Sequence, residues 1–204
     1  MRQTAFLGTE PIGSLLLRLS LPATVGMLVQ ASYNIVDAFF IGWGVGPMGL
    51  AGTAVAFPLH FFVMGIDTMG GVGAASLVSR SLGAGDVDRA DRALGTLVTL
   101  ALATGLSAAF LGRAFLPRLL VLLGASGEIL APARAYIAII LLGIPFHVLG
   151  VGLNSAVRAE GNARVAMFTM LISAGANTVL DPLFIFGFGW GIAGAAWATV
   201  ISQA

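Results

Sequence analysis

Long apolar segments constrain the fold of this sequence more than any other feature. A helix needs about 20 apolar residues to cross a bilayer. Five segments reach that length, and a sixth run begins near its end: 14–41, 52–81, 90–111, 129–157, 165–186 and 192–204. Only 9% of the residues are charged, against about 25% in an average soluble domain. The sequence therefore predicts an all-α, multi-pass membrane protein.

The last apolar run is too short to cross a bilayer, because the sequence ends at Ala204. An unfinished span would leave backbone groups unpaired in lipid. We therefore expect the chain to be part of a longer reading frame.

Arginines are distributed unevenly between the ends of these segments. Seven gather on one side: Arg2, Arg18, Arg80, Arg89, Arg92, Arg158 and Arg164. Three lie near the other side: Arg113, Arg118 and Arg134. Positively charged loops stay in the cytoplasm, so the N-terminus is predicted to be cytoplasmic.

Several classes of function have no support in the sequence. There is no cysteine, which excludes disulfides, thiolate metal sites and a cysteine nucleophile. No stretch is basic enough to predict a nucleic-acid partner. We find no nucleophile motif and no histidine pair at metal-ligand spacing, so the sequence predicts neither an enzyme nor a transition-metal site.

Three acids lie inside the apolar segments: Asp37, Asp67 and Asp181. A charge at the centre of a membrane helix costs about 2.5–3.5 kcal/mol, so such residues usually face a cavity or a partner. Asp37 continues a polar stripe at helical spacing, formed with Gln30, Tyr33 and Asn34. This stripe predicts an ion site at Asp37, with Gln30 and Asn34 as candidate residues lining a pathway.

Asp181 has polar neighbours of a different kind. Ser173 and Asn177 precede it at intervals of four residues, and Pro182 follows it. Proline has no N–H, so the carbonyl of Thr178 is expected to lose its helical donor. Hard cations prefer oxygen ligands, and a carboxylate removed from water also takes up a proton more readily. The segment thus predicts a cation or proton site of the kind found in secondary transporters.

Asp67 has fewer polar neighbours, and its role stays open between structure and function. His60 and His147 are more typical of packing or hydrogen-bonding residues than of proton relays, because neither has a carboxylate four residues away.

Four stretches together resemble the multidrug and toxic compound extrusion (MATE) transporters of the NorM-like and DinF-like prokaryotic branches. They are "LSLPATVGMLVQASYNIVDAFFIG", "GGVGAASLVSRSLGAGDVDRA", "LNSAVRAEGNARVAM" and "NTVLDPLFIFGFGWGIAGAAWATVISQA". The resemblance implies a fold of twelve helices in two six-helix lobes. Residues 1–204 then form most of the N-terminal transmembrane lobe, and the C-terminal lobe lies outside this chain.

The resemblance also implies a function and a site. Members of the family export small cationic or amphipathic compounds in exchange for Na⁺ or H⁺, in the bacterial inner membrane and without another cofactor. The matching cation or proton site comprises Asp37, Asp181, Asn177, Asn154 and Thr199, with Tyr33 lining it. The implied partners are these compounds, the lipid bilayer and the C-terminal lobe.

Three alternatives remain at this stage. A lipid-linked oligosaccharide flippase of the same superfamily needs a cationic cavity for pyrophosphate, whereas this chain offers acids. An intramembrane aspartyl protease needs two facing acids, which Asp37 and Asp181 could supply. A non-catalytic membrane scaffold would tolerate neutral replacements of both acids.

Overall fold

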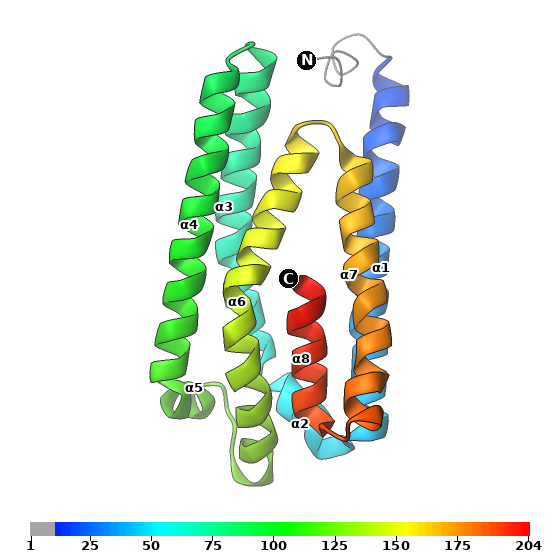
Figure 1. Ribbon diagram of the computed structural model, residues 1–204, viewed down its shortest axis with the longest axis vertical. Helices are drawn as coiled ribbons and strands as arrows, with labels where there is room; N and C mark the ends of the chain where they lie inside the picture. Colours follow the sequence, from blue (N-terminus) through cyan, green and yellow to red (C-terminus); the bar gives the residue numbers. More distant parts are fainter. Residues whose placement is uncertain (1–10) are drawn as a thin grey trace.

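The computed structural model describes residues 11–204 as an antiparallel bundle of helices (Figure 1). Its elements are α1 (Ile12–Gly44), α2 (Pro47–Ala54), α3 (Phe57–Gly83), α4 (Val87–Ala114), α5 (Leu116–Leu122), the 3₁₀ turn η2 (Gly127–Ile129), α6 (Leu130–Ala159), α7 (Ala163–Pro182), the π-helical turn η3 (Leu183–Gly187) and α8 (Gly191–Gln203). No strand occurs among these residues. Arg2, which contributes to the predicted orientation, lies outside the described residues.

Five stretches of the described chain are long and apolar enough to cross a membrane: Ile12–Gly44, Pro47–Gly83, Val87–Ala114, Gly127–Ala159 and Ala163–Gly187. Large apolar side chains such as Leu17, Phe62 and Phe110 are exposed on the outside of the bundle. Such a surface is suited to lipid and not to water. The all-α, multi-pass membrane fold is therefore confirmed.

Two predicted helices differ from the observed ones at prolines. The predicted helix over 52–81 is two helices, because α2 ends at Ala54 and α3 begins at Phe57. Pro58 is in the first turn of α3, where its missing N–H costs least. The predicted helix over 165–186 is α-helical only as far as Pro182 and continues as η3. Proline cannot donate the hydrogen bond that would extend a regular α-helix.

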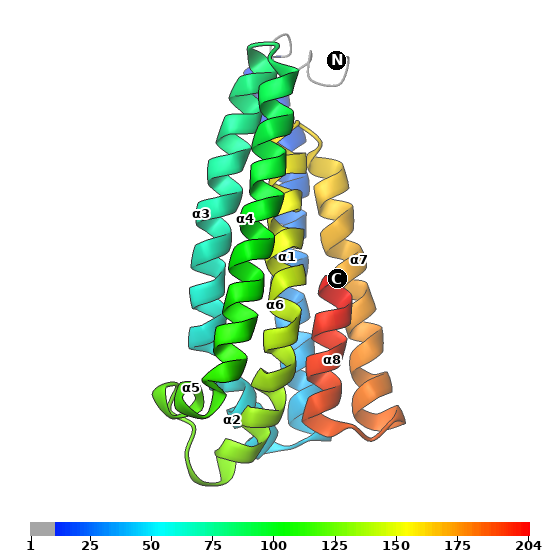
Figure 2. The same ribbon diagram turned by 60° about the vertical axis from the view of Figure 1, so that its left-hand side comes forward.

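The long helix α6 lies at the centre of the bundle. It packs against α3 and α4 on one side and against α8 on the other, while α1 packs along α7 (Figures 1 and 2). Glycine permits close backbone approach: a Cβ on Gly105 of α4 would lie 2.7 Å from the Pro145 Cα of α6. This arrangement brings α1, α6, α7 and α8 together around one interior region.

Candidate functional site

Asp37 and Asp181 come together because α1 and α7 pack along each other. Asp181 and Asn177 are 0% exposed, and Asn177 Nδ2 donates a hydrogen bond of 3.3 Å to Asp181 Oδ1. The four-residue spacing places both side chains on the same face of α7. Asp37 of α1 lies close enough for its carboxylate to interact directly with that of Asp181.

Three further side chains complete this region, one from α1 and two from other helices. Thr199 of α8 is buried, and both Tyr33 of α1 and Tyr136 of α6 interact with it. Sequence reasoning missed Tyr136. The sequence offered one signal for Tyr136: the chain contains only two tyrosines, and both belong to this region. We call Asp37, Asn177, Asp181, Thr199 and the two tyrosines the acid site.

The acid site contains oxygen atoms that lack hydrogen-bond donors. Among the described residues, four buried atoms of this region form no hydrogen bond of good geometry: Asp37 Oδ1, Asn177 Oδ1, Asp181 Oδ2 and Thr199 Oγ1. A buried polar atom without a partner is costly. Four such atoms on α1, α7 and α8 form a set of oxygens that a cation or a proton would satisfy.

The other predicted site residues lie away from this set. Asn154 of α6 donates from Nδ2 to the Ala166 carbonyl at 2.9 Å and to Thr169 Oγ1 at 2.8 Å. Thr169 precedes Asn177 by eight residues, which is about 12 Å along α7. Asn154 therefore joins α6 to α7 at a different level. Gln30 is half-buried, and Asn34 is exposed and bonds the Gln30 carbonyl of its own helix.

Asp67 lies outside the acid site, on the contact between α3 and α6. Its Oδ2 is 3.2 Å from Nε2 of His147. This contact agrees with the prediction that His147 is a packing or hydrogen-bonding residue, and no carboxylate lies four residues from it on α6. The carboxylate comes from a neighbouring helix, and spacing within one helix does not reveal such a partner.

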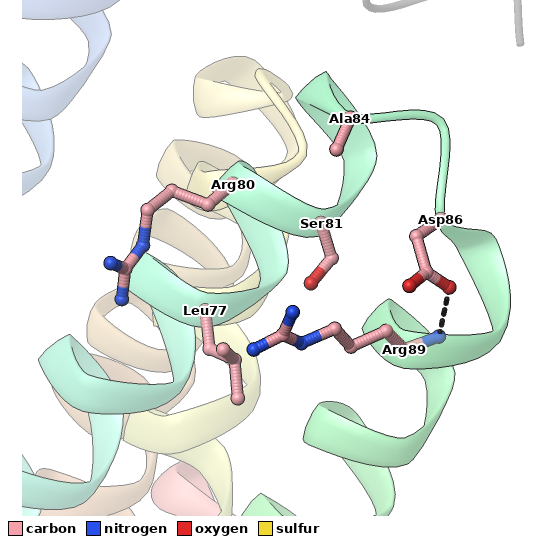
Figure 3. A pocket seen from close by; sticks show the side chains of 6 residues that line it. All are labelled: Leu77, Arg80, Ser81, Ala84, Asp86 and Arg89. Carbon is pink, nitrogen blue, oxygen red and sulfur yellow. Dashed lines mark hydrogen bonds between the residues drawn. The ribbon is translucent and has the colours of Figure 1, made fainter.

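A small pocket lies at the turn between α3 and α4, and neither the acid site nor Asp67 lines it (Figure 3). Its volume is about 170 Å³, and it is lined by Leu77, Arg80, Ser81, Ala84, Asp86 and Arg89. The Asp86 carboxylate accepts a hydrogen bond of 2.9 Å from the Arg89 backbone N–H and so caps α4. No member of the acid site lines this pocket.

Comparison with known proteins places this arrangement in a family. The MatE family model matches residues 22–183. The multidrug export protein MepA of Staphylococcus aureus (strain MRSA252) is 32% identical over 201 residues, which are 98% of this chain and 45% of MepA.

Solved structures agree with this match. A MATE protein in complex with MaD5 superposes with a TM-score of 0.92 at 33% identity, over 100% of this chain and 46% of that one. A MOP superfamily transporter from Pyrococcus furiosus superposes with a TM-score of 0.87 at 34% identity, over 93% and 42%. The chain thus spans less than half the length of these relatives. It belongs to the MatE family of membrane transporters, matches their N-terminal lobe, and is not an enzyme.

Proposed function

We propose that this chain is the N-terminal lobe of a multidrug efflux antiporter of the bacterial inner membrane. The whole protein exports cationic or amphipathic compounds in exchange for inward Na⁺ or H⁺. One observation carries the proposal: the carboxylates of half-buried Asp37 and fully buried Asp181 lie together, with unpaired buried oxygens around them. The relatives named as multidrug export proteins support it.

The acid site suits a monovalent ion. Carboxylate, amide and hydroxyl oxygens are ligands that hard cations accept, and they come here from Asp37, Asp181, Asn177 and Thr199. Two adjacent carboxylates also favour binding one proton, because two like charges cannot both be buried cheaply. Among residues 11–204, no three acidic, histidine or cysteine side chains converge as a multivalent metal site would require. The coupling ion is therefore Na⁺ or H⁺.

Neighbouring residues complete the proposed site. Tyr33 and Tyr136 place hydroxyl groups beside Thr199. Asn154 contributes from a distance, because its hydrogen bonds to α7 hold the helix that carries Asn177 and Asp181. Gln30 is half-buried on α1 and Asn34 is exposed, so both remain candidate residues lining a pathway outside the acid site.

Ion binding can be coupled to movement through α1 and α7. Without an ion, the two carboxylates repel each other across the contact between these helices. A bound cation or proton removes the repulsion and allows α1 to pack closely on α7. Pro22 lies within α1 and Pro182 ends α7, and proline weakens a helix where it removes a hydrogen bond. The ion then favours one access state through its different affinity for the two states.

The rival functions fit less well. A flippase for pyrophosphate-linked sugars needs cationic groups at its cavity, and the acid site has carboxylates instead. Each described arginine lies within about two helical turns of a helix end. Membership of a transporter family overturns the aspartyl protease alternative. A scaffold would tolerate loss of the carboxylates, which the following experiment tests.

The test is efflux of a fluorescent organic cation from cells that express the complete reading frame. Asp181→Asn should reduce the efflux rate at least about tenfold, equivalent to about 1.4 kcal/mol, with the protein still present in the membrane. Asp88→Asn, at an exposed acid in the first turn of α4, should leave efflux unchanged. Removing Na⁺ or collapsing the proton gradient in wild type identifies the coupling ion. Equal efflux from wild type and Asp181→Asn would refute the proposed coupling role.

A further inference from the structure

The buried carboxylate of Asp67, outside the acid site, lies near both histidines of the chain. The Asp67 side chain is 2% exposed and lies on α3, with its Oδ2 3.2 Å from Nε2 of His147 on α6. His60 precedes Asp67 by seven residues on α3, and its ring centroid is 5.6 Å from that of His147. The sequence contains no other histidine. We call these three residues the histidine cluster.

The surrounding helices carry titratable groups that can be compared with the charges acting on His60. Outside the histidine cluster, the titratable groups on α3, α6 and the elements packed against them are Arg80 of α3, Asp88, Arg89, Asp91, Arg92 and Arg113 of α4, Arg118 of α5, Glu128 of η2, Arg134, Tyr136 and Arg158 of α6, and Arg164 and Asp181 of α7. Helices α2 and α8 carry none. The charges that act on His60 are those of His147 and Asp67. His147 is the basic side chain that lies in contact with Asp67.

The number of protons decides the charge of this pair. Asp67 and His147 together are neutral with one proton, negative with none and positive with two. A net charge in a low-dielectric interior is expensive, so the pair is most stable when it holds one proton. Apart from the contact with His147, no described residue donates a hydrogen bond to either Asp67 oxygen. The carboxylate can therefore interact with His147 or carry the proton itself.

Exposure increases stepwise across the histidine cluster. The Asp67 side chain is 2% exposed, that of His147 is 19% exposed, and His60 lies on the surface of the lobe. Neutral imidazole can accept a proton at one nitrogen while it donates at the other. The order Asp67, His147, His60 therefore connects a buried acid to the outside of the lobe.

The histidine cluster is separate from the acid site but uses the same central helix. On α6, Tyr136 faces the acid site and His147 faces Asp67. These residues are eleven positions apart, about 16 Å along the helix axis.

We propose that Asp67, His147 and His60 form a second proton-binding site in this lobe. The site holds one exchangeable proton between α3 and α6, and His60 gives that proton access to the surface. The packing of α3 on α6 then depends on protonation. This site is independent of the ion bound at Asp37 and Asp181 and does not require that transport be cation-coupled.

The test is nuclear magnetic resonance of ¹⁵N-histidine in the protein expressed from the complete reading frame and placed in lipid nanodiscs. The His60→Gln and His147→Gln variants assign the signals, which are followed between about pH 5 and pH 9. At a given pH the protonated fraction of His147 should be lower in Asp67→Asn than in wild type, because the carboxylate 3.2 Å from Nε2 favours the cation.

Asp37→Asn is the matched control, because it removes an intramembrane acid from the other site and should leave the protonated fraction of His147 as in wild type. An unchanged protonated fraction in Asp67→Asn would refute the pairing, and a His147 that stays neutral throughout would refute the proton site. If Asp67→Asn does not fold, the infrared carboxyl band of wild type replaces it. That band should shift in His147→Gln, and an unchanged band would equally overturn the proposal.

Discussion

At the scale of single residues, the acids of this lobe are placed in two different electrostatic settings. Asp67 lies beside a histidine, so one proton makes that pair neutral. Asp37 lies beside another acid, so that pair needs an added cation or proton to reduce its charge. The second arrangement is the less stable one without a ligand. This is why we assign ion coupling to Asp37 and Asp181 and a separate proton site to Asp67.

Replacing Asn177 tests how strongly ion binding at the acid site depends on the Asn177 side-chain amide. Its Nδ2 donates to Asp181 Oδ1, while its own Oδ1 has no partner. A hydrogen bond to a charged group contributes about 1.5–3 kcal/mol. Asn177→Ala should therefore raise the concentration of coupling ion that gives half-maximal efflux at least about tenfold.

Asn34→Ala is the control for this prediction, because Asn34 is exposed and bonds the Gln30 carbonyl of its own helix. Its half-maximal ion concentration should equal that of wild type. The proposed ligand role of Asn177 would be abandoned if Asn177→Ala and Asn34→Ala behaved alike.

At the scale of helices, the sequence predicts which side chains share one face of a helix better than it predicts which side chains meet across two helices. Spacing within a helix is enough to group Asn177 with Asp181, because residues four apart share a helix face. The contacts of Tyr136 with Thr199 and of His147 with Asp67 join different helices. They depend on the rotation and offset of one helix against another, which tertiary packing decides. Asn154 shows the same limit, since its partners lie about two turns from Asn177.

The close packing of α4 against α6 depends on the absence of a side chain at Gly105. A Cβ there would lie 2.7 Å from Pro145 Cα, a backbone atom that cannot rotate away. Gly105→Ala should lower the free energy of unfolding by about 1–3 kcal/mol, as overpacking does. Gly95→Ala is the matched change on the same helix. It meets no atom within 4 Å and should be neutral or stabilising by up to about 1 kcal/mol.

Thermal unfolding of the two glycine variants in detergent, beside wild type, measures this difference. Gly105→Ala should melt at a lower temperature and Gly95→Ala at the same or a higher one. A Gly105→Ala protein as stable as wild type would show that α4 and α6 can separate at little cost.

At the scale of the whole lobe, the two ends of the bundle differ in charge. The turns that join α3 to α4 and α6 to α7 lie at one end, with Arg80, Arg89, Arg158 and Arg164 near them (Figure 1). Asp37 and Asp181 lie closer to the other end, within about 10 Å of the last residues of α1 and η3. If the arginine-rich end is cytoplasmic, the acid site lies nearer the outer side, from which the coupling ion enters.

Cysteine labelling tests this orientation directly, because the chain has no cysteine of its own. Ala84→Cys places a thiol at the turn after α3, and Ser126→Cys places one in the loop after α5, at the opposite end of the bundle. Both positions are exposed. A membrane-impermeant maleimide added to intact cells should label Ser126→Cys, and it should label Ala84→Cys only after the inner membrane is permeabilised. The reverse pattern would place the N-terminus outside, and the acid site would then lie nearer the cytoplasm, where an inward-moving ion is released and not captured.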